Sequence, residues 1–388
     1  MKIRGRVLVL AVSMPIIAFA VIGGFMSKAI AREDSYQYLR IFEDVVQLIL
    51  SNYVEDVNVD KVMHGAMHGL ADGLDPDSAY LDIDQVKVFD KGDLGGRAHT
   101  GVELTRQYYL RVVAARDGSP AAKAGLLPGD YIRAIDGKST RDVTVYEGAR
   151  LLRGTPGTKV HLTVIRGNAA EPHEIDLVRD DLPAIAVKSR IAAPGVGYLR
   201  VAEFGKGTAD QIKSEIAAVS KAGATNVIID LRGTAFGDID AGLAAARLFV
   251  KDGVLVYRQD RGKEKEAVSA AAGDGAITIN TVLLTDNGTS NGAEVFAAAL
   301  SGNKRATLVG ERTLGRAARQ KLVRLPDGSG LMLTHLIYMT PASVAIHEKG
   351  LVPDVAVEQP DVDFGQPPAA KDATLEKAIE SLTLKAAA

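Results

Sequence analysis

The sequence predicts a multidomain protein of the α+β and α/β classes, in which an N-terminal membrane segment and a helical region precede a small domain of short strands and an α/β core. Its 388 residues exceed what one compact core usually holds. Short strands separated by turns occur between residues 95 and 180, and strand and helix patterns alternate beyond residue 195. We therefore expect five parts, with the boundaries 1–31, 36–92, 93–181, 182–360 and 361–388.

The composition excludes several classes of function. The chain has 46 basic and 48 acidic residues, a net charge of -2 and only 5% aromatic residues, so we expect no binding of nucleic acid. It has no cysteine, which excludes disulfides and thiolate metal sites. His64 and His68 lie one helical turn apart, but no third ligand stands near them, so we expect no metal and no other cofactor.

The N-terminal segment has the properties of a membrane anchor. Residues 7–27 carry no charge over 21 positions and follow a basic cluster, so they can cross a bilayer with the N-terminus inside. The bulk of the chain would then lie outside the cytoplasm. Secretion after signal cleavage is the alternative, because residues 29–31 have the small-x-small form of a cleavage site. The apolar run is longer than a usual signal core, so we favour the uncleaved anchor.

Two amphipathic helices are predicted in the next part of the chain. Over residues 36–54, apolar side chains recur at steps of three and four and share one helical face: Leu39, Phe42, Val46, Ile49 and Tyr53. This face must be buried, either within its own domain or against a partner subunit in a homo-oligomer. The second helix is expected to begin near Asp60 and to end before Gly73 and Pro76.

The small domain is marked by turns with a mechanical role. Pro128-Gly129 makes a turn, and Asp136-Gly137 closes a hairpin. Together with the Ser-Pro-Ala and Ala-Gly-Leu runs that precede them, these residues resemble a PDZ domain. The resemblance implies a groove that binds an extended peptide as an added strand and captures its terminal carboxylate with loop amides.

The implied peptide groove lies between a strand and a helix. Its carboxylate loop falls near Gly101 and Val102, and the following helix supplies the other wall through Val145 and Ala149. Related domains usually have two glycines immediately before the binding strand, whereas here the Gly-Gly pair lies further upstream. A PDZ fold that serves only for packing is the alternative, and we favour peptide binding.

The core contains a strand and a turn that suit a nucleophile. The apolar strand at 281–285 leads into a glycine-broken turn at 288–294 and then into an alanine-rich helix. Such a turn exposes one side chain, and it directs the free N–H groups of the helix toward a substrate oxygen that becomes negative.

The order of these elements resembles the carboxyl-terminal processing peptidases, a family of PDZ-bearing serine proteases, over roughly residues 36–360. In this family the turn carries a serine nucleophile, and a lysine base follows in a Gly-Lys-Gly-x-x-Gln segment. Alignment on the Gly and Glu that flank the turn puts Asn291 at the nucleophile position and Arg316 at the base position. Gln320 matches the residue that orients the base. The resemblance implies a periplasmic protease that selects substrates by their C-termini.

The loop that supplies an oxyanion donor in the family also differs. Residues 234–237 stand where the peptidases have Asn-Pro-Gly-Gly, so Phe236 replaces a glycine and Gly237 remains. By resemblance, the oxyanion region includes Gly237 and Gly292. Phe236 either obstructs the scissile carbonyl or packs in the core. Loss of one oxyanion donor typically costs about 2.7–4 kcal/mol in the barrier.

Both members of the expected dyad are replaced by groups that cannot perform its chemistry. An amide does not attack a carbonyl as an alkoxide does, and a guanidinium stays protonated at any accessible pH. The sequence therefore predicts a catalytically impaired homologue that binds polypeptide C-termini, with regulation of an active paralogous protease as one consequence. Arg316 either pairs with a peptide carboxylate or forms a structural salt bridge.

Two alternatives remain open at this point. In the first, Ser290 is the nucleophile of an active serine-type endopeptidase whose base is one of four candidates: His335, His347, Lys304 and Lys321. In the second, the chain is a structural protein that assembles through its N-terminal helices.

Overall fold

The computed structural model describes residues 36–167, 171–360, 362–366 and 371–386. These residues belong to two compact units, one within Met1–Met67 and the other within His68–Ala388. The expected membrane segment, residues 1–31, lies outside the described residues. Within the described ranges, no helix is both long enough and apolar enough to cross a bilayer.

The described part of the first unit, residues 36–67, is mainly helical. Residues 36–52 form one helix, in agreement with the apolar period, and α2 (Val59–Asp72) begins in the same unit. Asn58 caps α2, because its side chain accepts a hydrogen bond at 2.9 Å from the backbone N–H three residues later. The predicted apolar face is partly covered: Phe42, Val46 and Ile49 are half-buried, whereas Leu39 and Tyr53 are each 62% exposed.

A short strand follows the helical region, and the sequence does not predict it. β1 (Ala79–Leu81) pairs antiparallel with β20 (Gly330–Met339). α3 (Ile83–Asp90) comes directly afterwards and begins with a capping box. In this box Asp82 Oδ1 accepts a hydrogen bond from the N–H of Gln85 at 2.8 Å, and Gln85 Oε1 accepts one from the N–H of Asp82 at 2.9 Å. The helical region thus contributes a strand to a sheet of the core.

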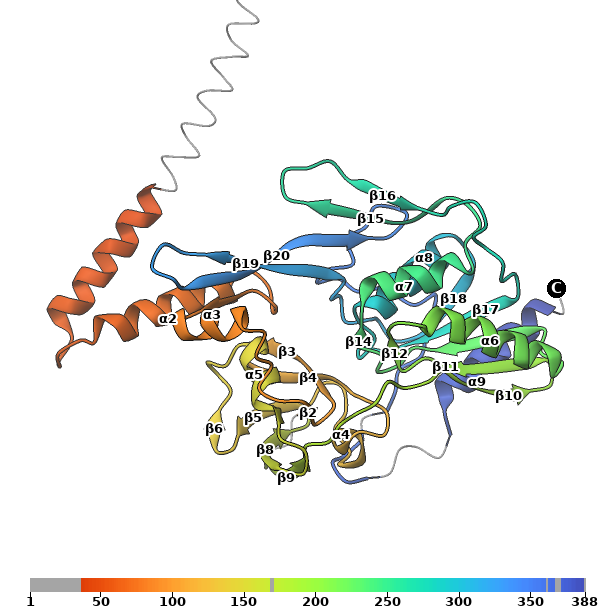
Figure 1. The fold of residues 1–388 in the computed structure, drawn as a ribbon, viewed down its shortest axis with the longest axis horizontal. Helices are drawn as coiled ribbons and strands as arrows, with labels where there is room; N and C mark the ends of the chain where they lie inside the picture. Colours follow the sequence, from red (N-terminus) through yellow and green to blue (C-terminus); the bar gives the residue numbers. More distant parts are fainter. Residues whose placement is uncertain (1–35, 168–170, 361, 367–370, 387–388) are drawn as a thin grey trace, which may run out of the picture. The chain divides into compact units, whose positions relative to one another are not determined.

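The small domain is an antiparallel sheet with two short helices (Figure 1). Its elements are β2 (Ala98–His99), β3 (Val102–Gln107), β4 (Tyr109–Ala115), α4 (Pro120–Lys123), β5 (Tyr131–Ile135), β6 (Lys138–Ser139), α5 (Val145–Leu151), β7 (Arg153–Gly154), β8 (Lys159–Ile165) and β9 (His173–Val178). The strand order is β3-β4-β5-β8-β9, so β3 lies at an edge. Asp136 (φ 49) and Gly137 (φ 74) form the predicted hairpin turn between β5 and β6.

The core is a largely parallel sheet with helices on both faces. Its elements are β10 (Lys188–Ala193), β11 (Val196–Arg200), β12 (Glu203–Phe204), α6 (Thr208–Lys221), β13 (Asn226–Asp230), β14 (Phe236–Gly237), α7 (Ile239–Arg247), β17 (Asn280–Thr285), α8 (Gly292–Gly302), β18 (Ala306–Gly310), β21 (Val355–Ala356) and α9 (Ala373–Ala386). The strand order is β10-β11-β13-β17-β18-β21, and all pairs except β10 with β11 are parallel. This is the alternation of strands and helices that the sequence predicts.

The two faces of the core sheet have separate hydrophobic clusters. Residues of α6, α7 and α8 pack against the side chains that point to one face, including Ile229 and Leu283. α9 covers the other face, where Ala378 and Leu382 are buried near Ile228 (Figure 1). The helical pattern expected in the C-terminal tail therefore belongs to a helix that forms part of the core.

A second sheet completes this unit. It adds β15 (Val254–Asp260), β16 (Glu266–Ser269) and β19 (Ala318–Arg324) to β1 and β20. The order is β1-β20-β15-β16, and β19 pairs with β20 through the predicted Pro-Asp-Gly turn, in which Gly328 has φ 92.

Candidate active site

The turn between β17 and α8 has the backbone of a nucleophile elbow, and Asn291 stands at its apex. Asn291 is the N-cap residue of α8, with φ 52 and ψ -121, a strained conformation that places one side chain above the strand-to-helix turn. Its side-chain amide is half-buried and donates a hydrogen bond to the carbonyl oxygen of Ala235 at 3.1 Å. The position that aligns with the family's nucleophile thus carries a neutral donor, which is bonded to the loop at 234–237.

Polar contacts hold the elbow in place from below. Thr289 Oγ1 donates to the carbonyl of Leu231 at 2.9 Å. Asp286 Oδ1 accepts from the N–H of Gly233 at 2.8 Å and from the N–H of Gly288 at 3.0 Å, and it lies 3.0 Å from Thr289 Oγ1, whose single proton it shares with the carbonyl of Leu231. Burial raises the pKa of Asp286, and these donors act against that shift. The elbow is therefore a rigid part of the core.

The two glycines of the predicted oxyanion region sit where backbones meet. A Cβ atom on Gly292 would lie 2.4 Å from the carbonyl oxygen of Asp238. A Cβ atom on Gly237, which has φ 110, would lie 2.0 Å from the carbonyl oxygen of Phe204. No side chain fits at either position, so both glycines are required for the close approach of these segments.

Phe236 packs in a small cluster rather than standing free in the loop. Its half-buried ring joins a cluster with Val113 and Ala114 of β4 and with Ala235 and Leu314. Of the two expectations for this residue, core packing agrees with the structure. The ring thus links the oxyanion loop to the small domain.

Arg316, at the position of the family's base, is enclosed by acceptors from two distant segments. Its Nε donates to Asp77 Oδ2 at 2.9 Å, and its Nη1 donates to Glu103 Oε1 at 2.8 Å and to the carbonyl oxygen of Leu104 at 2.9 Å. Burial raises the pKa of Glu103, against the attraction of Arg316. Of the two fates expected for Arg316, the structural salt bridge is the one observed. We call Asp77, Arg316 and Glu103 the arginine clamp.

Glu294 connects the elbow to the segment that carries Arg316. Its carboxylate is fully buried and accepts from Thr313 Oγ1 at 2.5 Å, from the N–H of Gly315 at 2.6 Å and from the N–H of Arg316 at 2.7 Å. Burial raises the pKa of Glu294 to about 7, although these donors favour the charged form. Glu294 fixes the distance between the two dyad positions.

None of the remaining sequence candidates is hydrogen-bonded to Ser290 within the described residues. Ser290 is 1% exposed, and its Oγ makes no hydrogen bond within the described residues. Gln320 Nε2 donates to Thr334 Oγ1 at 3.3 Å across the β19–β20 pair. His347 Nε2 lies 4.0 Å from Asp75 Oδ2. Lys304 and Lys321 are exposed, and His335 is a half-buried residue of β20.

The predicted peptide groove has its two walls in place. Gly101 (φ 81) precedes β3, and a Cβ atom there would lie 2.2 Å from Ser119 Cβ, so the carboxylate loop packs tightly on the start of α4. On the opposite wall, Val145 begins α5 and is half-buried, while Ala149 is exposed. Val102, also half-buried, opens β3.

The upstream Gly-Gly pair has a different role from the one it has in related domains. Gly95 and Gly96 have φ 82 and 134, and Cβ atoms on them would lie 2.6 Å from the carbonyl of Arg150 and 2.5 Å from that of Gly154. These glycines pack against the end of α5 and β7. Of these three glycines, only Gly101 lies directly before β3.

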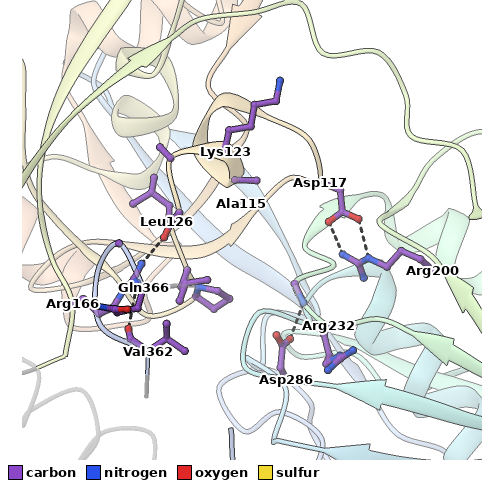
Figure 2. A pocket seen from close by; sticks show the side chains of 17 residues that line it. Ala115, Asp117, Lys123, Leu126, Arg166, Arg200, Arg232, Asp286, Val362 and Gln366 are labelled. Atoms are coloured by element: carbon purple, nitrogen blue, oxygen red, sulfur yellow. Dashed lines mark hydrogen bonds and ion pairs between the residues drawn. The ribbon is translucent and has the colours of Figure 1, made fainter. Parts of the chain in front are cut away.

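A cavity of about 670 Å³ lies between the small domain and the core, and neither Asn291 nor Arg316 is among the residues that line it. Figure 2 shows Lys123 and Leu126 on one side and Arg200 with Asp286 on the other. Arg200 pairs with Asp117 through two hydrogen bonds of 2.9 Å. Sequence reasoning missed this cavity because its lining comes from many segments that are far apart in the chain.

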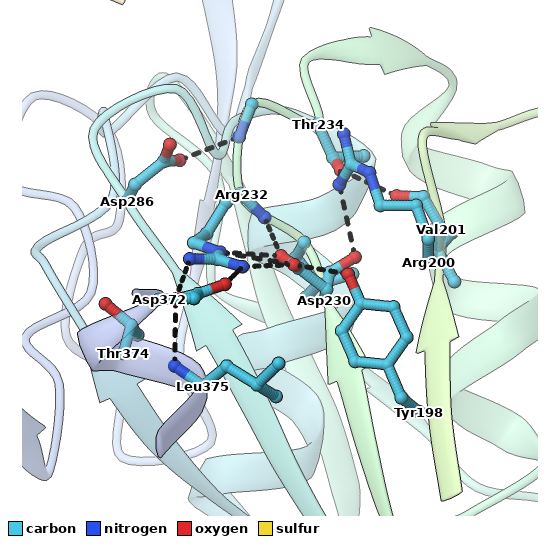
Figure 3. A network of polar contacts seen from close by, with 12 residues as sticks. Tyr198, Arg200, Val201, Asp230, Arg232, Thr234, Asp286, Asp372, Thr374 and Leu375 are labelled. Carbon is cyan, nitrogen blue, oxygen red and sulfur yellow. Dashed lines mark hydrogen bonds and ion pairs between the residues drawn. The ribbon is translucent and has the colours of Figure 1, made fainter. Parts of the chain in front are cut away.

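A buried polar network lies behind the cavity (Figure 3). Arg232 bridges Asp230 and Asp372, with Nη2 to carboxylate distances of 2.6 and 2.7 Å, and Tyr198 donates to Asp230 Oδ2 at 2.8 Å. Burial works against the charged form of Asp230, yet Arg232 holds the pKa of that carboxyl below its usual value. The network attaches the start of α9 to the end of β13.

Comparisons with known proteins agree with this architecture. The sequence profile of peptidase family S41 matches residues 195–357, and a PDZ domain profile matches residues 111–166. A solved structure of a photosystem II D1 C-terminal processing protease superposes with a TM-score of 0.67 at 27% identity and covers 82% of this chain and 92% of that chain.

Two curated relatives are also described as carboxy-terminal processing proteases. A carboxy-terminal-processing protease of Bartonella bacilliformis is 32% identical over 339 residues, which cover 84% of this chain and 77% of the relative. The carboxy-terminal processing protease CtpA of Bacillus subtilis is 32% identical over 315 residues, which cover 81% of this chain and 67% of the relative. The chain therefore belongs to the carboxy-terminal processing proteases of peptidase family S41, and its PDZ domain precedes its peptidase domain.

Proposed function

We propose that the protein is a catalytically impaired carboxyl-terminal processing protease that binds polypeptide C-termini without cutting them. The observation that carries this proposal is the elbow itself, whose apex holds the amide of Asn291 in a hydrogen bond to Ala235. A serine hydrolase needs an oxygen nucleophile at this point, and an amide nitrogen with its lone pair delocalised is not a substitute.

The base position supports the same proposal. Burial alone would lower the pKa of Arg316, but Asp77 and Glu103 hold it above its ordinary value, so the guanidinium does not accept a proton. Ser290 offers no replacement, since its hydroxyl is buried and has no hydrogen-bonding base among the described residues. In a triad hydrolase the loss of the nucleophile costs about 10⁶-fold in kcat.

Binding of a polypeptide end is supported by the edge position of β3. An extended peptide adds to such an edge through backbone hydrogen bonds, and the loop at Gly101 captures its carboxylate. The carbonyl of Leu104 already accepts a hydrogen bond from Arg316, so it points out of the sheet at this edge. The arginine clamp therefore lies at the strand that an incoming peptide joins, and a peptide N–H that reaches this carbonyl shares it with Arg316.

The location of the protein is part of the proposal. The uncharged run at 7–27 and the basic cluster before it support an inner-membrane anchor, with the bulk of the chain in the periplasm. In that place the protein competes with active relatives for the same polypeptide ends, and so regulates them. Exposed large apolar side chains on the helix at 36–52, among them Tyr38, Leu39 and Leu48, support self-association.

A cleavage assay tests the catalytic part. The full-length protein in detergent is incubated with an unfolded protein substrate, and new termini are detected by mass spectrometry. We expect none from the wild type, none from Ser290→Ala and none from Asn291→Ser alone, because Arg316 still cannot act as a base. Specific cleavage by the wild type that disappears in Ser290→Ala would refute impairment.

A binding assay tests the second part. A labelled peptide with a free C-terminal carboxylate is titrated against the same peptide with a C-terminal amide, by fluorescence anisotropy. We expect the free acid to bind at least tenfold more tightly, because loop amides recognise the charge. Equal affinity of the two forms would contradict carboxylate capture.

A further inference from the structure

The outer face of the PDZ sheet carries a cluster of tyrosine and arginine side chains. We call it the tyrosine–arginine patch, and its members are Tyr108, Tyr109, Tyr131, Arg111, Arg133 and Arg141. It borders a hollow of about 500 Å³. Leu110 and Ile132 face the interior and are fully buried, so their neighbours along β4 and β5 point to the opposite, outer face.

The side chains of the patch are ordered by stacking. The guanidinium of Arg141 lies 4.7 Å from the ring centre of Tyr108, and that of Arg133 lies 5.6 Å from the ring centre of Tyr109. The two tyrosine rings meet edge to face at 5.2 Å. Tyr131 donates from its hydroxyl to Gln107 Oε1 at 3.1 Å.

Tyr108 adopts an unfavourable backbone conformation. It forms the turn between β3 and β4 with φ 70, a region that a bulky L-residue rarely adopts and that glycine or asparagine usually fills. Its side chain is nevertheless 61% exposed. An exposed aromatic ring on a strained turn contributes little to the hydrophobic core, which points to a role in binding.

The patch also has an uncompensated positive charge. Among the described residues, no ion pair includes Arg111, Arg133 or Arg141, whereas neighbouring Arg106 is paired with Asp72. In a chain whose net charge is -2, three guanidinium groups without carboxylate partners form a local excess. Arginine side chains without carboxylate partners, next to tyrosine rings, complement acidic segments of a partner.

The position of the patch connects it to the peptide groove. β3 runs from Val102, beside the carboxylate loop, to Gln107, beside Tyr108. These five residue steps span about 17 Å at about 3.4 Å per residue. A polypeptide whose carboxylate lies at Gly101 and whose chain runs along β3 reaches Tyr108 with about its sixth residue from the end.

We propose that the tyrosine–arginine patch binds acidic side chains located about six to eight positions before the carboxyl terminus of a bound polypeptide. This inference rests on the proposed capture of C-termini by the PDZ groove. Continuity with β3 favours a polypeptide over a single-stranded nucleic acid, which aromatic and arginine side chains also bind.

The test uses two twelve-residue peptides that share the last five residues and a free carboxylate. One carries Asp or Glu at the sixth to eighth positions from the end, and the other carries Asn or Gln there. We expect the full-length protein to bind the acidic peptide about three- to tenfold more tightly in fluorescence anisotropy, because exposed ion pairs are individually weak. The preference should fade at high salt.

Three variants locate the effect. The double variant Arg133→Gln, Arg141→Gln should lose the acidic preference. Arg190→Gln is the matched control, because Arg190 is exposed and lies 4.4 Å over the ring of Tyr198 in the peptidase domain, and it should keep the preference. Tyr108→Gly suits the backbone at φ 70, so it should weaken binding of the acidic peptide without loss of thermal stability.

The outcomes separate this inference from the proposed function. Equal binding of the two peptides, with free acids still preferred over amides, overturns the patch subsite and leaves carboxylate capture standing. An acidic preference that is the same for free acids and amides overturns the link to the groove. No binding of either peptide defeats both proposals. Binding of a twelve-residue oligothymidine that is lost in the double variant identifies nucleic acid as the occupant and refutes the inference.

Discussion

Replacement of Arg316 by alanine should destabilise the junction between the PDZ domain, the helical region and the peptidase domain. The side chain of Arg316 is 16% exposed and those of Asp77 and Glu103 are 5% and 28% exposed, so the variant leaves two largely buried carboxylates facing each other. Breaking a buried ion pair costs about 3–5 kcal/mol. Because Glu103 can take up a proton, we expect the lower end of this range, about 3 kcal/mol at pH 7.

The matched control is Arg319→Ala. The guanidinium of Arg319 pairs with Asp240 at 2.7 Å, but it is 40% exposed, so its loss should cost at most about 1 kcal/mol. Hydrogen exchange followed by mass spectrometry suits this comparison, because a chain of several domains need not unfold in one step. In Arg316→Ala, β3 and β1 should exchange about a hundredfold faster, since 1.4 kcal/mol corresponds to a factor of ten.

The loss of stability in Arg316→Ala should also depend on pH. Without Arg316, burial keeps the pKa of Glu103 above its unfolded value of 4.5. The protonated form then stabilises the fold below pH 4.5, and this contribution disappears as the pH rises through the folded pKa. The difference between variant and wild type should therefore grow from pH 5 to pH 8. If Arg316→Ala and Arg319→Ala exchange alike at every pH, the arginine clamp does not hold the domains together.

Three further predictions concern the elbow and the loop beside it. Burial raises the pKa of Glu294 from 4.5 to about 7, so its protonated form stabilises the fold below pH 4.5. This stability should fall by on the order of 3 kcal/mol as the pH rises to 7. Urea unfolding of Glu294→Gln should lack this pH dependence, and an unchanged dependence would show that another group titrates. Gly237→Ala should prevent folding, because its Cβ would lie 2.0 Å from a carbonyl oxygen. Gly233→Ala is the control: no atom lies within 4 Å of its Cβ, and its φ of 61 should cost about 1 kcal/mol. Equal melting temperatures of the two variants would argue against the close approach at Gly237. The double variant Asn291→Ser, Arg316→Lys should cleave unfolded substrates slowly if the frame of the dyad is retained, and its complete inactivity in a folded protein would mean that the oxyanion loop is also lost.

The fold was largely predictable because its signals are local. The apolar period at 36–52 and the Asp-Gly hairpin at 136–137 each predicted the element that the structure contains. β1 escaped prediction because three residues are too few for a period, and its pairing partner lies about 250 residues away in β20. Tertiary pairing alone makes it a strand.

For the candidate site, motif spacing assigned Asn291 to the turn before the helix and Arg316 to the position of the family's base. The structure has Asn291 at the N-cap of α8 and Arg316 in the loop before β19, and their catalytic assignment stays a prediction. The partners of Arg316 were not accessible from the sequence, because Asp77 and Glu103 are 239 and 213 residues away from it. Long-range pairs of this kind depend on how domains dock, which no local pattern records.

Helix α9 has a consequence for the fate of the molecule itself. Ala378 and Leu382 are embedded beneath the sheet, and Asp372 at the root of the helix is bound to Arg232. A protease that begins at a loose tail needs an unstructured end to grip, and here it must first detach the helix from the interior. Degradation through this segment therefore depends on how often α9 opens locally, and the contacts of Ala378, Leu382 and Asp372 make that opening rare.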